Sequence, residues 1–226
     1  AIMARIPRIR EEQPEQLARR ADTVAGAATQ SISFVVWTVA LITILAELGV
    51  NIAPVLATVG LAGLAVGFAA QNVIRDYLHG FFILVEDWYR VGEVAIVAGI
   101  GGLVVDINLR RTVLRDLDGT MHIIPNSKIE LASNMTRDWS RINLNVEVAY
   151  SEDLDRVIEV IDEVGKQLKD DPVLGPDLLS TPHVERVDKL GSSGIEIKIL
   201  AETKPIRQWA LTGEMRKRLK GRFDQE

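Results

Sequence analysis

Apolar and polar positions divide the chain into an apolar N-terminal part and an alternating C-terminal part. Residues 33–50 carry only one acidic side chain, and about 18–20 such residues cross a hydrocarbon core of roughly 30 Å. Asn51 and Pro54 then break the helix, and a second apolar run begins at Val55 and stays uncharged until Arg75. Two apolar helices joined by a short turn predict a membrane hairpin, with a helical hairpin of a soluble protein as the alternative.

The second apolar run, residues 55–72, is rich in small residues. It holds several alanines and glycines at three positions, which are Gly60, Gly63 and Gly67. Each glycine costs a helix about 1 kcal/mol relative to alanine, but small residues let helix backbones pack closely in lipid. The large residues Leu64 and Phe68 are four positions apart and share one face, about one turn apart. This pattern predicts a helix that lines a symmetric pore, with a buried core helix as the alternative.

Charged residues set the predicted orientation of the hairpin. Residues 1–31 form an arginine-rich connection without the features of a signal peptide, and a polar helix is expected from Glu15. Arginines precede the first apolar helix and Arg75 follows the second, whereas the turn between them has none. Because basic residues collect on the cytoplasmic side, both ends of the hairpin are predicted to face the cytoplasm. Further transmembrane helices are expected upstream of Ala1.

An amphipathic segment, residues 73–85, follows the second apolar run and contains Gly80. Trp88, Tyr89 and Arg90 come next. Aromatic rings and long cations are favoured in the headgroup region, so these three residues are predicted to lie at the membrane interface. Ordinary packing onto the next domain is the alternative, and both can hold together.

Short runs rich in valine, isoleucine, leucine and threonine then predict strands separated by glycine-rich or Asp-Gly turns. The predicted strands cover residues 93–97, 102–108, 110–116 and 120–124. Their regular spacing predicts a small antiparallel barrel.

The C-terminal part predicts the order β-α-β-β-α, which is typical of a small α+β sandwich. Strands are expected at 143–148, 183–190 and 194–203, and helices at 151–168 and 212–223. Ser151 is the predicted N-cap of the first helix. The basic end of the last helix is interpreted as a solvated face, with anionic lipid or nucleic acid as alternative partners.

Composition restricts the function. The net charge is −5, which gives no reason to expect a nucleic-acid partner, and cysteine is absent. The mean hydropathy is +0.13, so the apolar residues are concentrated in one part of the chain. The histidines His79, His122 and His183 lack metal-ligand spacing, and no nucleophile motif or phosphate loop occurs. The sequence therefore predicts no enzyme, no metal site and no cofactor.

Three ordered motifs carry a resemblance to a known family. The helix ending GLAVGFAAQN (63–72), the RVGE motif (90–93) and the segment DGTMHIIPNSKI (118–129) resemble the MscS family of small-conductance mechanosensitive channels. The similarity covers about residues 30–226. It implies a homoheptamer in the inner membrane, with the C-terminal domains in the cytoplasm.

The resemblance also implies a domain organisation. A membrane helical hairpin is expected to precede an Sm-like β-barrel domain and a ferredoxin-like α+β sandwich that forms a vestibule. The expected divisions are residues 1–31 for the connection, 32–90 for the hairpin and interfacial helix, 91–133 for the β domain and 134–226 for the vestibule domain.

By position, the resemblance assigns roles along the pore helix. Leu64 and Phe68 match the two apolar rings that close the pore, and Asn72 and Gly80 match positions where the helix can bend. The helix-packing positions are matched by Ala57, Gly60, Leu61, Gly63, Ala65 and Gly67. Leu61, Phe68 and Asn72 depart from the residues usual in the family, so knob packing, pore width and the kink are where this chain is expected to differ.

The implied function is a channel gated by membrane tension that releases small ions and osmolytes on hypo-osmotic shock. Membrane lipids are its expected partners, ions and osmolytes its permeants, and nucleic acid is not expected. The alternative is a membrane-anchored scaffold that binds RNA or protein through its Sm-like ring. Residues 93–124 contain no tryptophan, tyrosine or phenylalanine, which counts against that alternative because RNA-binding surfaces usually stack bases on aromatic rings.

Overall fold

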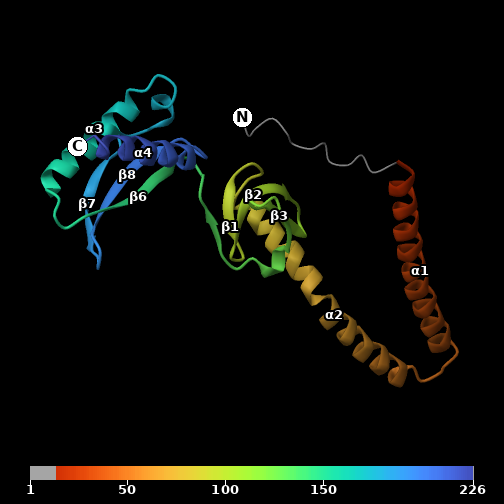
Figure 1. The fold of residues 1–226 in the computed structure, drawn as a ribbon. Helices are drawn as coiled ribbons and strands as arrows, with labels where there is room; N and C mark the ends of the chain where they lie inside the picture. The colour runs from red at the N-terminus through yellow and green to blue at the C-terminus, as the bar shows by residue number, and fades with distance from the viewer. Residues whose placement is uncertain (1–13, 226) are drawn as a thin grey trace. The chain divides into compact units, whose positions relative to one another are not determined.

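The computed structural model describes residues 14–225 (Figure 1). The described residues divide after Ala70 into two compact units, which are described separately below. Part of the predicted arginine-rich connection lies outside the described residues, and its remainder belongs to the first helix.

The first unit contains helix α1 (Pro14–Glu47) and the first half of helix α2 (Ala53–Val85). The segments Ala21–Glu47 and Ala53–Val85 are long and apolar enough to cross a membrane. Helix α1 gives way to a turn at Gly49, whose φ of 76° suits glycine. The side-chain oxygen of Asn51 accepts a hydrogen bond of 3.1 Å from the amide of Ala53, at the first residue of α2. The two predicted apolar helices are confirmed.

A β domain follows the C-terminal end of α2 within the second unit (Figure 1). All its strand pairs are antiparallel, and their order is β4-β3-β2-β1-β5. The strands are β1 (Val94–Val97), β2 (Ile100–Ile107), β3 (Arg111–Arg115), β4 (Met121–Pro125) and β5 (Ala132–Asn134), with the 3₁₀ helix η1 (Asn126–Lys128) between the last two. Sequence reasoning found β1 to β4 but missed β5, a strand of only three residues.

The core of the β domain includes residues from outside the strands. Ile83 of α2 and Tyr89 of the connecting turn are 1% and 2% exposed. They pack with buried residues of the strands and of the segment after η1, which are Ala95, Val97, Val104, Leu114, Ile124 and Ile129. The end of α2 is therefore part of the β domain's core.

The C-terminal domain pairs a sheet of three strands with helices α3 and α4, which Figure 1 shows packed beside the sheet. Its elements are β6 (Ser140–Val148), α3 (Leu154–Lys169), the 3₁₀ helix η2 (Gly175–Asp177), β7 (His183–Leu190), β8 (Ile195–Thr203) and α4 (Gln208–Phe223), and the strand order is β6-β8-β7. Alternate residues of the central strand β8 are buried, and residues of both helices join them in one core. The predicted order β-α-β-β-α is confirmed.

Two local predictions in this domain are wrong. Asp153, not Ser151, caps α3, since its carboxylate accepts hydrogen bonds from the amides of Asp155 and Arg156. Helix α4 begins at Gln208, four residues before the expected start. The first turn of α4 has no side-chain cap. The sequence therefore predicts the start only at Thr212, where the apolar and basic residues of the helix begin to recur.

The basic end of α4 is engaged in ion pairs with other parts of the domain. Arg218 lies 2.5 Å from the carboxylate of Asp171 and 2.9 Å from that of Glu214. Arg222 lies 3.3 Å from Glu163 on α3. Arg218 and Arg222 are thus paired with acidic side chains.

Candidate pore helix and its attachment to the β domain

The N-terminal half of α2 presents the predicted gate residues on one exposed face. Leu64 and Phe68 are 61% and 75% exposed and are separated by one helical turn, about 6 Å along the axis. No charged side chain lies on α2 before Arg75. The two residues are therefore exposed on the single chain, and their role as a gate stays a prediction.

The glycines of this segment leave open space around the helix. Within the described part of the chain, a methyl group added at Gly60, Gly63 or Gly67 would meet no atom within 4 Å. The other predicted packing positions, Ala57, Leu61 and Ala65, are four residues apart and are also exposed. Such a surface of small residues permits another helix to approach closely.

Helical hydrogen bonding in α2 continues through Asn72 and Gly80, the two predicted bend positions. Asn72 is exposed, whereas Gly80 is buried. The assignment of a bend to either residue stays a prediction.

Gly80 has a packing role that sequence reasoning missed. A Cβ atom at this position would overlap the backbone carbonyl of Leu109 and the side-chain amide of Asn126. Leu109 lies in the turn between β2 and β3, and Asn126 begins η1. The absence of a side chain at Gly80 thus lets the backbone of α2 rest directly on the β domain.

Two polar side chains strengthen the same contact. The buried carboxylate of Asp76 accepts a hydrogen bond of 2.8 Å from the amide of Ser127, and Nδ1 of His79 lies 3.4 Å from the carbonyl oxygen of Ile129. Asp76, His79 and Gly80 occur at helical spacing on one face of α2. This face attaches the end of α2 to the segment around η1.

Asn126, from the recognised IPNSK motif, connects this segment to the β2–β3 turn. Its side-chain amide donates to the carbonyl of Asn108 over 2.8 Å, and its side-chain oxygen accepts from the hydroxyl of Thr112 over 3.1 Å. Asn126 is fully buried, so the loss of either bond would leave a polar group unsatisfied.

Tyr89 is packed into the β domain, and its place at the membrane interface stays a prediction. Its side chain is 2% exposed, and its hydroxyl lies 2.9 Å from the hydroxyl of Thr112. Burial raises the pKa of the Tyr89 phenol. Packing onto the β domain, the alternative considered for this segment, holds for Tyr89. Trp88 is half-buried and donates its indole N–H to Glu86 over 2.7 Å, and its interfacial role stays a prediction.

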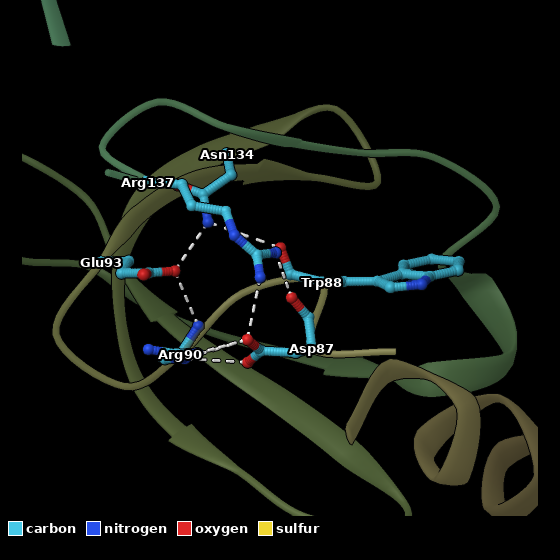
Figure 2. Close-up of polar contacts among 6 residues, drawn as sticks. All are labelled: Asp87, Trp88, Arg90, Glu93, Asn134 and Arg137. Atoms are coloured by element: carbon cyan, nitrogen blue, oxygen red, sulfur yellow. Dashed lines mark hydrogen bonds and ion pairs between the residues drawn. The ribbon is translucent and has the colours of Figure 1, made fainter. Parts of the chain in front are cut away.

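The turn after α2 is organised around Asp87, as Figure 2 shows. Asp87 has a φ of 56°, and its carboxylate receives Nη2 of Arg90 at 2.5 Å and Nη2 of Arg137 at 2.9 Å. Arg137 also donates to the backbone carbonyl of Asp87. The hydrogen bond from Arg90 is the main reason that the pKa of the Asp87 carboxyl lies below its ordinary value.

A second carboxylate extends this cluster to β5 (Figure 2). Glu93 accepts hydrogen bonds from the amide of Arg90 over 2.9 Å and from the side chain of Asn134 over 2.6 Å. Sequence reasoning selected Arg90 as a lipid contact, which stays a prediction, but missed Asp87, Glu93, Asn134 and Arg137. Arg137 is 50 positions from Asp87, and no local pattern signals that pairing.

Within the described residues, no group of three or more histidine, cysteine or acidic side chains is placed to hold a metal ion. His122 lies 2.9 Å from Asp116 across the β3–β4 turn, and His183 is exposed on β7. The three histidines thus occupy separate structural positions.

Three segments match descriptions of one family of proteins. Residues 31–71 match "Mechanosensitive ion channel, transmembrane helices 2/3", and residues 72–137 match "Mechanosensitive ion channel, beta-domain". Residues 142–226 match "Mechanosensitive ion channel MscS, C-terminal".

The chain is also similar to curated proteins along most of its length. It is 33% identical over 208 residues to the small-conductance mechanosensitive channel of Caldanaerobacter subterraneus subsp. tengcongensis, covering 92% of this chain and 73% of that protein. It is 26% identical over 205 residues to the moderate conductance mechanosensitive channel YbiO of Escherichia coli, covering 91% of this chain but only 28% of that protein. An MscS family protein of Archaeoglobus fulgidus is 31% identical over 173 residues, which cover 74% of this chain and 58% of that protein.

Solved structures share the fold. A crystal structure of Helicobacter pylori MscS in a closed state matches with a TM-score of 0.75 and 21% identity, covering 94% of this chain and 83% of that one. A cryo-EM structure of Arabidopsis thaliana MSL1 matches with a TM-score of 0.65 and 20% identity, covering 92% and 75%.

Proposed function

Since the chain belongs to the MscS family of mechanosensitive ion channels, we propose that it forms a pore that opens under membrane tension. Its role would be to release small ions and osmolytes from the cytoplasm during hypo-osmotic shock. The observation that carries this proposal is the exposed and uncharged face of α2, on which Leu64 and Phe68 are separated by one turn and flanked by open glycine positions.

The proposed channel is a homoheptamer in the inner membrane, with both ends of the helical hairpin toward the cytoplasm. Neighbouring copies of α2 would pack through the grooves at Gly60, Gly63 and Gly67. The knobs that enter them would be Ala57, Leu61 and Ala65. Leucine is larger than alanine, so the α2 helices would stand further apart at the level of Leu61 than at the other two knobs.

The gate is proposed to be hydrophobic. Seven copies each of Leu64 and Phe68 would form two apolar rings, and a narrow apolar constriction is not wetted by water. An ion would then have to lose its hydration to pass. Lateral tension favours the state that occupies more area in the membrane, and the smooth glycine and alanine surfaces allow α2 to tilt between states of similar free energy.

The C-terminal end of α2 supports this mechanism because it is attached to the β domain. The contacts of Asp76, His79 and Gly80 with the segment around η1 fix that end of the helix. Movement of the helix during opening would therefore concentrate in the preceding residues, near Asn72. The predicted bend at Asn72 fits this division between a movable and a fixed part.

The alternative of a membrane-anchored RNA or protein scaffold finds no support among the similar proteins, which are described as channels or as MscS family members.

A downshock survival assay tests the proposed function. The chain is expressed in cells that lack their own mechanosensitive channels, and the cells are then transferred to a medium of low osmolarity. We expect survival to rise above that of cells with an empty vector, and we expect the rise to depend on insertion of the chain into the membrane. Membrane-inserted protein that gives no protection would contradict the proposal.

A further inference from the structure

An open pocket lies beside the β2–β3 turn. It has a volume of about 400 Å³ and is lined by Asn108, Arg110, Arg111, Ile123 and Pro125. Two of the five lining residues carry a permanent positive charge, and two are apolar. A pocket of this composition suits a ligand that joins an anionic group to an apolar part.

The backbone that carries the two arginines is held in place. The side-chain oxygen of Asn108 accepts hydrogen bonds of 3.0 Å from the amides of both Arg110 and Arg111. The backbone carbonyl of Arg110 accepts a hydrogen bond of 3.0 Å from the amide of the buried Asn126. The positions from which the two guanidinium groups extend are therefore fixed before a ligand binds.

The charges of the two arginines are only partly compensated. Arg111 lies 3.8 Å from the carboxylate of Asp106, and both of these side chains are about half exposed. Arg110 forms no ion pair among residues 14–225, although it lies close enough to Asp76 to interact with it electrostatically. Asp76 is itself engaged by the amide of Ser127. Arg110 thus retains capacity for an anionic ligand.

The pocket lies at the level along α2 where the apolar segment ends. Arg75 and Asp76 are the first charged residues of α2, and the preceding helical part, about 20 residues, matches the thickness of a hydrocarbon core. The headgroup region extends about 5–7 Å further. Arg110 interacts with Asp76 and belongs to the turn that rests on Gly80, so it lies beside the first charged turns of α2.

We propose that the Arg110–Arg111 pocket binds the phosphate group of an anionic phospholipid from the cytoplasmic leaflet. This inference rests on the proposed function for the membrane placement of α2. The planar guanidinium groups donate paired hydrogen bonds to phosphate oxygens, and Ile123 and Pro125 contact the apolar part next to the phosphate. Because the same turn rests on Gly80, a bound lipid would help to anchor the end of α2.

Native mass spectrometry of the full chain in a neutral detergent tests the proposal. The protein is titrated separately with phosphatidylglycerol, phosphatidylcholine and inorganic phosphate. The double variant R110Q/R111Q removes the two charges, and R110K/R111K keeps them without the planar guanidinium groups. The matched control R216Q/K217Q removes two exposed cations from α4 and changes the net charge by the same amount.

The wild type and R216Q/K217Q are expected to bind phosphatidylglycerol in preference to phosphatidylcholine. R110Q/R111Q should bind it about tenfold or more weakly, because each basic residue near an anionic lipid contributes substantially to affinity. R110K/R111K should recover part of the lost affinity. Equal binding of phosphatidylglycerol by the wild type and R110Q/R111Q would overturn the proposal. Binding of inorganic phosphate without phosphatidylglycerol would assign the pocket to a free anion and overturn the lipid assignment.

Tension-activated currents from the same protein preparations separate this inference from the proposed function. A wild type that conducts, together with lipid binding unaffected in R110Q/R111Q, would overturn the lipid site alone. A wild type that gives no current, together with selective loss of lipid binding in R110Q/R111Q, would support the lipid site and contradict the channel.

Discussion

Replacement of Gly80 by alanine probes the contact between α2 and the β domain. Gly80 is buried, and an added Cβ would overlap the carbonyl of Leu109 and the side-chain amide of Asn126. The carbonyl belongs to the backbone of a hydrogen-bonded turn, so it cannot rotate away as a flexible side chain would. The helix or the turn must therefore shift to accept the methyl group.

The magnitude follows from two opposing effects. Alanine is better than glycine in a helix by about 1 kcal/mol. Overpacking against a fixed neighbour costs about 1–3 kcal/mol, and the overlap with backbone atoms places Gly80→Ala at the upper end. The expected net loss of stability is about 2 kcal/mol. For a unit of about 150 residues this corresponds to a fall in Tm of roughly 4–8 °C.

Thermal unfolding of the detergent-solubilised chain, followed by tryptophan fluorescence, measures this change. Three of the four tryptophans lie in residues 71–226, so the signal reports mainly on the unit that contains the contact. Gly213→Ala is the matched control, because Gly213 lies inside α4 and an added Cβ there meets no described atom within 4 Å. The control is expected to keep or raise the Tm.

The opposite signs of the two glycine substitutions make the test decisive. If Gly80→Ala melts at the same temperature as the wild type or higher, as Gly213→Ala should, the close packing of α2 on the β domain is refuted.

Three other perturbations address separate parts of the account. Gly63→Leu should fill the groove that receives a neighbouring helix and raise the opening tension in patch recordings; an easier opening would count against the packing of knobs into grooves. The hydrogen bond from Arg218, with those from two backbone amides, lowers the pKa of Asp171 to about 2. A depressed carboxyl pKa contributes stability that is present above about pH 4 and is lost as the pH falls toward 2. Asp171→Asn should therefore reduce the fall of Tm between about pH 4 and pH 2. An unchanged slope of Tm against pH would contradict the pairing of Asp171 with Arg218. Arg137→Met removes one of the two cations on Asp87 and its hydrogen bond to the Asp87 carbonyl, so it should lower the Tm slightly; a Tm at or above that of the wild type would show that the ion pair adds no stability.

Elements with strong periodicity could be predicted from the sequence. The strand at 183–190 is predicted with the bounds that β7 has, because the glycine-rich turn at 191–194 ends it. The end of α3 was placed within one residue, since the apolar face runs out there and Pro172 follows. The two apolar helices were equally clear, because a long uncharged run has few other interpretations.

Features that depend on distant residues could not be predicted. Strand β5 exists only because it pairs with β1, nearly 40 positions earlier in the chain. The sequence predicts an interfacial position for Tyr89 because it stands between Trp88 and Arg90. Its burial becomes evident only when Thr112 of β3 is in place, because the two hydroxyl groups lie together. The choice between Ser151 and Asp153 as a helix cap depends on where the chain leaves β6, since both residues are good caps.

The candidate gate was predictable, whereas the attachment of α2 was not. Leu64 and Phe68 stand out as large residues at helical spacing in a segment of glycine and alanine. The resemblance also marks Gly80, but as a position where the helix can bend. Its contact with Leu109 and Asn126 becomes evident only when the β domain is in place.

Pressure-clamped recording from liposome patches tests the hydrophobic gate most directly. Leu64→Ser and Phe68→Ser place a hydroxyl on the gate face, and Val66→Ser makes a similar change at an exposed position on the opposite side of α2. The wild type is expected to open only under tension, and the two gate variants should open at lower tension because a polar ring is wetted more readily, with Val66→Ser close to the wild type. Thresholds that are unchanged in both gate variants would contradict the assignment of Leu64 and Phe68 as the gate.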